Sequence, residues 1–325
     1  MDRQAFLLNR LSDGQFHSGQ SLAHELNISR TAICKRVRAL EALGLDIYSV
    51  RGKGYRLSQP IELLDEAIIR QHMSGPGNQR LRDIEVFTEI DSTNMYMVRE
   101  LETGVIHGRA VLAEFQQSGR GRRGKNWVSS FAGGVCLSIG WQFDPTPASL
   151  ASLSLATGVV VCRCLRQLGV ESAQLKWPND IVSGGRKLGG ILIETRSETG
   201  GASDVILGLG LNVELSNREE VVIDQPVTSL NEILKKGISR NELVGLLLDE
   251  LGGMLGSYAD KGFSSYLAEW RSYDSLGGRE ASIIFPGETL FGVVLGITEN
   301  GLLQMDIDGE ERVFSSGEIS LRARQ

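Results

Sequence analysis

The sequence predicts an α/β (α+β) protein of three successive domains: a winged helix-turn-helix over residues 1–62, a mixed-sheet domain over residues 63–273 and a small SH3-like β-barrel over residues 274–325. Three observations indicate this division. Short amphipathic helices and a basic hairpin fill the first sixty residues, strand and helix patterns alternate through the middle, and short strands separated by turn residues close the chain. At roughly 100 to 200 residues per domain, 325 residues can form two or three such units.

The composition is that of an ordinary globular protein, with 41% hydrophobic and 23% charged residues. No run approaches the roughly 20 consecutive apolar residues of a membrane span, and the amino terminus lacks the pattern of a signal peptide. We therefore expect a cytoplasmic protein without a membrane partner. The net charge is −6, yet residues 1–60 carry nine Lys and Arg against five Asp and Glu, which indicates a head that faces nucleic acid.

Cysteine and histidine residues are too scattered to predict a metal centre. The only close cysteine pair, Cys162 and Cys164, lies in an apolar helical run without a nearby histidine, whereas zinc sites use paired ligands at set spacings. The sequence contains neither a P-loop nor a G-x-S-x-G elbow. These patterns favour reduced thiols, no resident metal and no nucleophilic triad.

The head shows three helix patterns followed by a hairpin. An apolar stripe over residues 4–11 ends before Asp13-Gly14, and a short helix follows over residues 20–26. Ser29 is placed as the N-cap of a third helix that ends near Leu43. Two short strands then flank a basic tip. This layout predicts a winged helix-turn-helix with the third helix in the major groove of DNA and the hairpin on phosphate.

The predicted DNA contacts are polar and basic residues of the third helix and of the hairpin tip. A winged helix that binds protein and merely exposes a solvated charged face is the alternative. The positive charge on both elements favours DNA. The expected DNA-binding residues are Ser29, Arg30, Thr31, Lys35, Arg38, Arg51 and Lys53.

A junction between a predicted strand and a predicted helix carries the polar run Ser92-Thr93-Asn94. Backbone N–H groups at the start of a helix lack partners within it, so they can hold a polar or anionic group of a ligand. The junction is therefore a candidate binding element. A helix cap without any further role explains the same residues.

The glycine-rich run Gly119–Gly124, GRGRRG, formally matches a dinucleotide-binding fingerprint. Its context excludes that fold, because the strand-like run VCLSIGW follows where the fingerprint needs a helix. Arg120, Arg122 and Arg123 lie between the glycines, and guanidinium groups bind phosphate oxygens in bidentate fashion. The loop therefore predicts a clamp for a phosphate-bearing ligand, closed by packing of Trp127. A solvated turn and an RNA-binding segment are the alternatives.

Two lysines flank the turn sequence WPND. Lys176 ends a predicted strand, and Lys187 lies on the return strand of the next hairpin, two residues before Gly189. Glycine in a strand leaves room for a ligand against the backbone, and an ammonium group neutralises a carboxylate. Asn212 ends a later buried strand, where its amide needs a hydrogen-bonding partner.

The other patterns are structural. A largely apolar helix over residues 149–169 is expected in the core, and two helices are expected at about 240–257 and 262–270. Residues 279–322 alternate in five short strands broken by Pro286-Gly287, Asn300-Gly301 and Asp308-Gly309, which predicts the SH3-like barrel.

Several of these elements together resemble one known family. The DSTN junction, GRGRRG, KWPND, the strand RKLGGIL, the winged head and a late EISLR segment follow the order typical of biotin protein ligases of the bifunctional type, the biotin-operon repressors. The resemblance implies a class II synthetase-like ligase domain that converts biotin and MgATP to biotinyl-5'-AMP and pyrophosphate. A lysine of the biotin carboxyl carrier protein then displaces AMP. The same adenylate would act as corepressor, by favouring a homodimer on operator DNA of biotin synthesis genes.

The family's site residues carry over to matching positions of this sequence. The resemblance implies biotin contacts by Ser92, Thr93, Asn94, Gln116, Arg120, Gly121, Arg122, Lys187 and Gly189, with Lys187 on the carboxylate. It implies nucleotide contacts by Arg120, Arg122, Arg123, Trp127, Lys176, Asn179, Asn212 and Arg322. The implied catalytic residues are Arg120, Lys176, Lys187 and Asp180. Adenylation joins two anions, so neutralisation by cations agrees with these roles.

Some assignments leave alternatives open. Asp180 is a candidate to orient or deprotonate the incoming lysine, and it is equally a turn-capping residue. Where the best-known repressor of the family packs an aromatic residue on adenine, this sequence offers Pro226 and Val227. Two rival functions are a ligand-sensing repressor without catalysis, which the intact clamp and KWPND disfavour, and a lipoyl ligase, which the winged head and GRGRRG disfavour.

Overall fold

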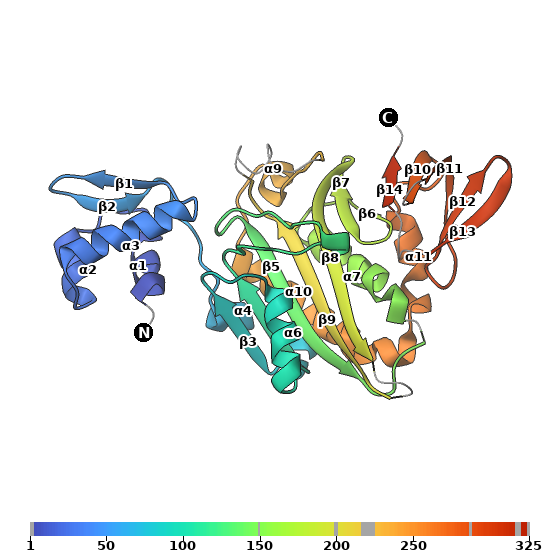
Figure 1. Ribbon diagram of the computed structural model, residues 1–325, viewed down its shortest axis with the longest axis horizontal. Helices are drawn as coiled ribbons and strands as arrows, with labels where there is room; N and C mark the ends of the chain where they lie inside the picture. Colours follow the sequence, from blue (N-terminus) through green and yellow to red (C-terminus); the bar gives the residue numbers. More distant parts are fainter. Residues whose placement is uncertain are drawn as a thin grey trace.

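The computed structural model describes residues 3–148, 150–197, 201–215, 225–285 and 288–315, together with the backbone of residues 320–323. Its elements form three units that follow one another along the chain, with the amino-terminal helices at one end and the last strands at the other (Figure 1). The predicted domain order is confirmed by this element order. The predicted boundaries at residues 62 and 273 lie between elements and stay predictions.

The head has the predicted winged helix-turn-helix elements. Ser29 caps the third helix, because its side chain accepts a hydrogen bond from Ala32 N at 3.1 Å. Apolar residues spaced along the helices, among them Leu8, Leu22 and Ile33, are buried against one another and form a separate small core. The elements are α1 (Arg3–Leu11), α2 (Gly19–Glu25), α3 (Arg30–Ala42), β1 (Ile47–Val50) and β2 (Gly54–Leu57).

A seven-stranded mixed sheet forms the central domain. Its strand order is β3-β4-β5-β9-β8-β7-β6, and only β3 and β4 run parallel. The long central strands are almost wholly buried, as expected of strands covered on both faces. The strands are β3 (Asp83–Phe87), β4 (Arg109–Ala113), β5 (Gly134–Phe143), β6 (Ala173–Lys176), β7 (Asp180–Ser183), β8 (Arg186–Ser197) and β9 (Ser203–Asn212).

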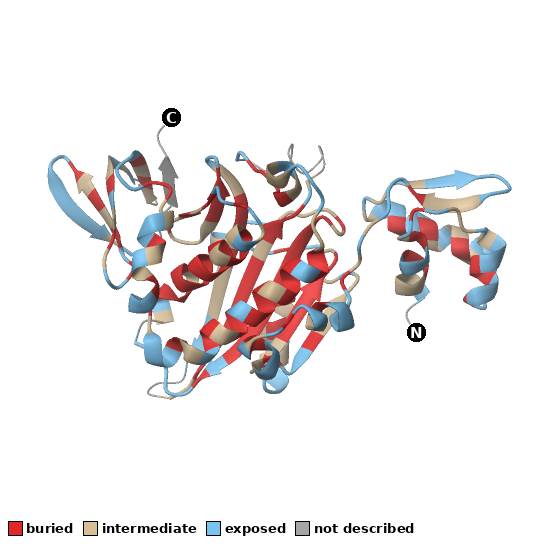
Figure 2. Cartoon of the chain, turned by 180° about the vertical axis from the view of Figure 1, so that it is seen from behind, coloured by how far each residue is buried: buried red, intermediate tan, exposed pale blue. Residues whose placement is uncertain are grey.

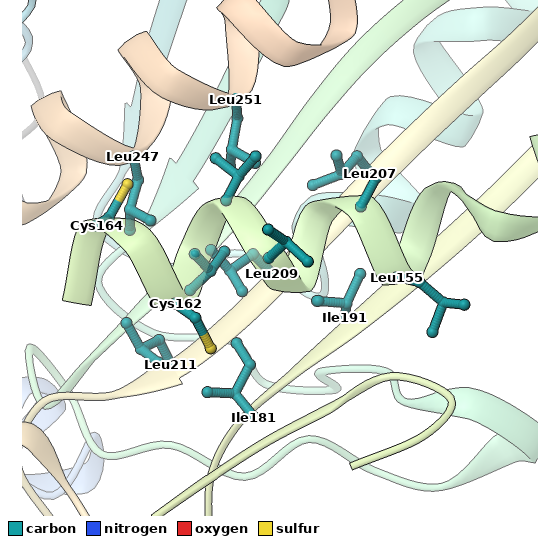
Figure 3. Packing of buried hydrophobic residues seen from close by; sticks show 14 of the residues in the cluster. Leu155, Cys162, Cys164, Ile181, Ile191, Leu207, Leu209, Leu211, Leu247 and Leu251 are labelled. Carbon is teal, nitrogen blue, oxygen red and sulfur yellow. The ribbon is translucent and has the colours of Figure 1, made fainter. Parts of the chain in front are cut away.

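Helices cover the two faces of this sheet unequally. The apolar helix α7 lies on one face, where its Leu155 and Cys162 belong to the same buried cluster as Leu207, Leu209 and Leu211 of β9 (Figure 3). Buried residues are concentrated on α7 and on the strands beneath it (Figure 2). The predicted core role of this helix is confirmed. The helices are α4 (Glu66–Gln71), α5 (Pro76–Arg80), α6 (Thr93–Thr103), α7 (Leu153–Gln167), α9 (Leu230–Leu234), α10 (Arg240–Lys261) and α11 (Ser264–Tyr273), with 3₁₀ turns η1 (Arg122–Gly124) and η2 (Leu150–Ser152).

Helix α10 is longer than the sequence suggested. It continues past residue 257 because Tyr258 is fully buried on its inner face. It ends at Lys261, where Gly262 has a φ of 59° in the left-handed region. The predicted end at 257 was therefore wrong by one turn, and α11 begins and ends later than predicted. Within the described ranges, no helix has the length and apolar character of a membrane span.

The last strands form a five-stranded antiparallel sheet in the order β13-β12-β11-β10-β14. The number of strands is as predicted, and Asn300-Gly301 and Asp308-Gly309 fall at its turns. Pro286-Gly287, the third predicted turn, lies outside the described residues. The strands are β10 (Glu280–Phe285), β11 (Glu288–Ile297), β12 (Leu303–Ile307), β13 (Glu310–Phe314) and β14 (Ser320–Ala323).

A buried ion pair holds the chain that leaves the head. Arg240, at the start of α10, pairs with Glu114, just after β4, at 2.7 Å, and both side chains are only 4% exposed. The other oxygen of Glu114 accepts from Leu64 N at 2.5 Å, while Arg240 donates to the carbonyls of Gly134 and Glu62. Each partner therefore neutralises the other and also satisfies backbone groups of the linker.

We predict that Arg240→Met lowers the free energy of unfolding by about 3–5 kcal/mol, because it leaves the Glu114 carboxylate buried without its cation. Denaturant titration measures this change. The control is Arg312→Met, since Arg312 pairs with Glu310 at 3.6 Å on the surface and should contribute less than about 1 kcal/mol. Similar losses in both variants would contradict the role given to the buried pair.

Candidate active site

One face of the central sheet is nearly free of side chains where β5, β9 and β8 lie side by side. Gly208 and Gly210 alternate along β9, and Gly210 is the register partner of Gly190 on β8. Register partners project to the same face of a sheet. A Cβ on Gly208 would lie 2.3 Å from Asn94 Oδ1, and a Cβ on Gly210 would lie 2.4 Å from the ring of Trp127. These glycines therefore let other groups lie directly on the sheet, and we call this surface the site face.

Helix α6 brings the predicted Ser92-Thr93-Asn94 run onto the site face. Ser92 is the N-cap of the helix, and all three residues are buried. The backbone N–H and the hydroxyl of Thr93 both donate to Gln116 Oε1, at 2.8 and 3.1 Å. These two bonds fix the orientation of the Gln116 amide. The structure thus joins two segments that the sequence separates by more than twenty residues.

Ser138 on β5 connects the same residues from below. Its hydroxyl oxygen lies 2.8 Å from Thr93 Oγ1 and 2.5 Å from Asn94 Oδ1. The side chain of Ser138 is fully buried, so its polar atom depends on these partners. Asn94 in turn donates from Nδ2 to Glu194 Oε2 at 2.8 Å. A continuous polar network therefore runs along the floor of the site face.

The loop Gly119–Gly124 lies at the edge of the site face and has no dinucleotide-binding helix. A short 3₁₀ turn is followed by β5, so the rejection of that fold from the sequence is confirmed. Arg120, which is 44% exposed, pairs with Glu194 at 3.2 Å. Arg122 donates to Asn179 Oδ1 at 3.3 Å, whereas Arg123 is exposed and has a left-handed φ of 58°. The loop therefore aims Arg120 and Arg122 inward and Arg123 outward.

Arg122 is half-buried beside Asp180. Burial lowers the pKa of the Arg122 guanidinium from its ordinary value, and the Asp180 carboxylate opposes that shift. An arginine keeps its charge at neutral pH in either case. The structure therefore places a permanent, partly desolvated cation next to the KWPND turn, where its attraction for an anion exceeds that of a cation in water.

Asp180 lies between cations at the start of β7. Lys187 Nζ is 2.7 Å from Asp180 Oδ1, and both side chains are 20% exposed. Lys176 is the register partner of Asp180 on β6. A carboxylate that is already paired with an ammonium group is better suited to hold that cation in place than to remove a proton. The geometry thus favours a positioning role for Asp180 over the role of general base.

The side-chain amide of Asn212 is hydrogen-bonded to the segment that follows residue 224, as its burial requires. Its Nδ2 donates to Thr228 O at 3.1 Å, and Lys187 forms two backbone hydrogen bonds with the same segment, to Pro226 O and from Thr228 N, each at 2.9 Å. Val227 is buried beside them. The segment therefore lies against the strand that carries Lys187. Residues 216–224, which include the first half of the predicted adenine loop, lie outside the described residues.

Gly189 faces the core side of the sheet, and only the backbone of Arg322 is described. A Cβ on Gly189 would meet Leu211 Cδ1 at 2.9 Å on the side packed under α7, so Gly189 faces away from the site face. The side-chain period of a strand is two residues, and Gly190 is therefore the glycine on the site face, while the predicted biotin contact of Gly189 stays a prediction. The backbone of Arg322 pairs with Ser282 in β14, and its side chain lies outside the described residues.

Three residues of the site face were not predicted. Glu194 and Ser138 carry the polar network, and Cys136 lies beside Ser129, with Sγ 3.5 Å from its hydroxyl. Burial raises the pKa of the Cys136 thiol, so the thiol stays neutral there. The alternating glycines of β9 were the available signal, because they mark a strand on which something else must lie closely.

The head presents the predicted basic residues to solvent. Arg30, Thr31, Lys35 and Arg38 are exposed on α3, and Arg51 and Lys53 are exposed at the hairpin tip, while Ser29 is the cap of α3. Arg56 lies between two aromatic rings, 5.0 Å from the centroid of Phe16 and 5.2 Å from that of Tyr48. This cation–π sandwich, which the sequence did not reveal, stiffens the base of the hairpin.

Comparison with known proteins identifies the family. The family models named Biotin/lipoate A/B protein ligase family, HTH domain and Biotin protein ligase C terminal domain match residues 86–212, 3–56 and 276–322. The bifunctional ligase/repressor BirA of Salmonella typhimurium is 38% identical over 98% of this chain and 97% of its own length. The chain belongs to the bifunctional biotin ligase/repressor family. The BirA of Escherichia coli, at 37% identity over the same share of this chain, agrees.

A solved biotin ligase supports the fold of three quarters of this chain. The biotin protein ligase from Aquifex aeolicus in complex with biotin and ATP aligns with a TM-score of 0.64 and 28% identity, covering 75% of this chain and all of that chain. The resemblance stated from the sequence is thereby confirmed for the family and the fold. The roles of individual residues in this biotin ligase stay predictions that rest on the geometry above.

We predict that Gly208→Ala weakens biotin binding by at least about tenfold, because the added Cβ displaces Asn94 and with it the Ser138-Thr93-Gln116 network. Isothermal titration calorimetry without ATP measures the change. Gly237→Ala is the matched control, since nothing lies within 4 Å of a Cβ there. Wild-type affinity of a folded Gly208→Ala protein would show that the network does not serve biotin.

Proposed function

We propose that this chain joins biotin to AMP at the site face and then transfers the biotinyl group to a lysine of the biotin carboxyl carrier protein. One observation carries the proposal. A polar network and a strand face made of glycines and small side chains adjoin three cations that are held by acidic or amide partners, Arg120, Arg122 and Lys187. This arrangement suits a long, mostly apolar acid whose carboxylate must meet a triphosphate.

The residue roles follow from where each group lies. The ureido ring would occupy the Thr93-Gln116 end of the site face, and the biotin tail would run towards Gly190 and Lys187. Asn94 and Trp127, which lie directly on Gly208 and Gly210, would line its path. Hydrogen-bonding groups fixed in advance bind a neutral ring without reorganising. The carboxylate would then replace Asp180 as a partner of Lys187, and the α-phosphate would meet Arg120 and Arg122.

In the first step a carboxylate oxygen attacks the α-phosphorus of MgATP, the bond from the α-phosphorus to the bridging oxygen breaks, and pyrophosphate leaves. The attack brings two anions together, so guanidinium and ammonium groups held at the meeting point lower its barrier. In the second step the neutral amine of the carrier lysine attacks the acyl carbon, AMP leaves, and the amine loses a proton. Asp180 serves these steps by holding Lys187 and by lying near Arg122.

The head extends the proposal to gene regulation. Its basic α3 and hairpin tip would bind operator DNA of biotin synthesis genes, and biotinyl-5'-AMP would act as corepressor by favouring a homodimer. Two copies of α3 one helical turn apart read a palindromic site. The pairing of a winged head with the ligase domain in a single chain supports this part of the proposal over a ligase that acts alone.

We predict that incubation with biotin, MgATP and an apo carrier domain adds one biotinyl group to the carrier, observed as an intact-mass increase, and that lipoate adds none. Lys187→Met should slow the reaction by about 100-fold, because it removes the cation that meets the carboxylate. Lys236→Met, at an exposed lysine of the same domain, is the control. No mass gain by the wild-type protein with either acid would refute the ligase.

We predict that Lys53→Ala weakens DNA binding about equally on all sequences and reduces the slope of log affinity against log salt by about one, as expected for one lost phosphate contact. Fluorescence anisotropy over a salt series measures both quantities with the adenylate-loaded protein. Arg312→Met is the control, since Arg312 belongs to the C-terminal sheet. An adenylate-loaded protein that stays monomeric in sedimentation at high concentration would exclude the dimeric repressor.

A further inference from the structure

The turn between β11 and β12 of the C-terminal sheet fits tightly against the central domain. Gly301 in this turn has a φ of 78°, in the left-handed region that favours glycine. A Cβ on Gly301 would lie 2.6 Å from Leu155 Cδ1 and 2.9 Å from Ser152 Oγ, both at the start of α7. A larger residue at this position would force the turn or the side chains of Leu155 and Ser152 to move.

Two carbonyl oxygens of this turn accept hydrogen bonds from the central domain. Ser152 Oγ donates to Asn300 O at 2.6 Å, and Trp177 Nε1 donates to Gly301 O at 3.0 Å. Trp177 is only 3% exposed, so the second bond is shielded from water. A buried donor left without its acceptor is costly, and the bond therefore fixes the indole relative to the C-terminal sheet.

Trp177 opens the turn that positions two of the proposed catalytic cations. Asn179, two residues later, accepts from Arg122, and Asp180, one residue further, pairs with Lys187. Both cations lie where the carboxylate and the α-phosphate would meet. The indole is therefore connected to them through a stretch of only three residues.

Helix α7 supports both turns at once. Ser154 Oγ donates to Pro178 O at 3.1 Å, while Ser152, two residues earlier, holds Asn300. The start of α7 thus lies between the C-terminal turn and the KWPND turn, and Trp177 is the direct contact between the two. Movement of the C-terminal turn would reach Asn179 and Asp180 through this indole.

We infer that the Asn300-Gly301 turn is a positioning element of the adenylation site and acts through Trp177 on Asn179 and Asp180. The inference rests on the proposed function and gives the C-terminal domain a role in which none of its residues needs to touch the substrates. Displacement of Arg122 and Lys187 by a fraction of an ångström slows the joining of two anions. The ureido end of the site face lies on other elements, so biotin binding should change little.

The test measures adenylate formation and biotin binding separately. Trp177→Phe keeps the ring packed and removes the N–H group, and we expect the single-turnover rate of biotinyl-5'-AMP formation to fall about tenfold. Quenched-flow mixing with MgATP gives the rate, and calorimetry with biotin alone gives the affinity, which should stay within twofold. A purely structural role would lower the melting temperature and leave the rate of the folded protein unchanged.

Ser152→Ala is the matched control, because it removes the other hydrogen bond of the same turn without touching Trp177. It should lower the melting temperature and keep the adenylation rate within twofold of wild type. Gly301→Ala is a second route to the same loss, since the added Cβ crowds Leu155 and Ser152 and strains a residue with a φ of 78°. Rates within twofold of wild type in both folded variants, Trp177→Phe and Gly301→Ala, would overturn the inference.

The double variant Trp177→Phe/Gly301→Ala tests whether the two residues act through one contact. If they do, its rate should match that of the slower single variant, whereas a product of the two single effects would show independent actions and contradict the inference. The wild-type protein separates this outcome from failure of the proposed function. If wild-type protein forms no adenylate, the proposed function fails. If wild-type protein forms adenylate and the variants form it at the same rate, only the positioning role fails.

Discussion

The close approach of Asn94 and Trp127 to the glycines of β9 is the steric constraint on which the active site depends. Any side chain at Gly208 or Gly210 would occupy the space that these residues use. Because the approach is so close, Asn94 can meet Ser138 and Glu194 at hydrogen-bonding distance. The sheet therefore carries Asn94 and Trp127 directly on its surface, and the absence of strand side chains beneath them fixes their positions in the site.

Each cation beside the site face has an acidic or amide partner within the protein, which holds it in position. Arg120 faces Glu194, Lys187 faces Asp180, and Arg122 lies beside Asp180 and Asn179. Cations gathered without counter-ions would repel one another and resist burial. The acidic partners stabilise the folded, empty site, and an incoming carboxylate or phosphate can take their place without a large change in net charge. Asp180 therefore holds Lys187 in place, a role that its position in a turn sequence did not indicate.

Local patterns predicted most of the fold. The details that could not be predicted, such as the end of α10 and the partners of Glu194, depend on contacts between residues far apart in the sequence. The cap at Ser29, the hairpin of the head and the five last strands follow from spacing and turn residues alone. Burial and strand register decided two details: α10 continues beyond the predicted end because Tyr258 is buried, and Gly190 rather than Gly189 faces the site because strand register fixes the side. Glu194 was missed because its partners are Arg120, 74 residues earlier, and Asn94, 100 residues earlier.

Both flanking domains are attached to the central domain immediately before residues of the active site. The linker from the head is held by Glu114, two residues before Gln116, through a bond to Leu64 N. The C-terminal turn is held by Trp177, two residues before Asn179. Each attachment is a hydrogen bond shielded from water, so each fixes the backbone of its own segment. The two ends of the chain are therefore anchored within two residues of groups that would bind biotin and ATP.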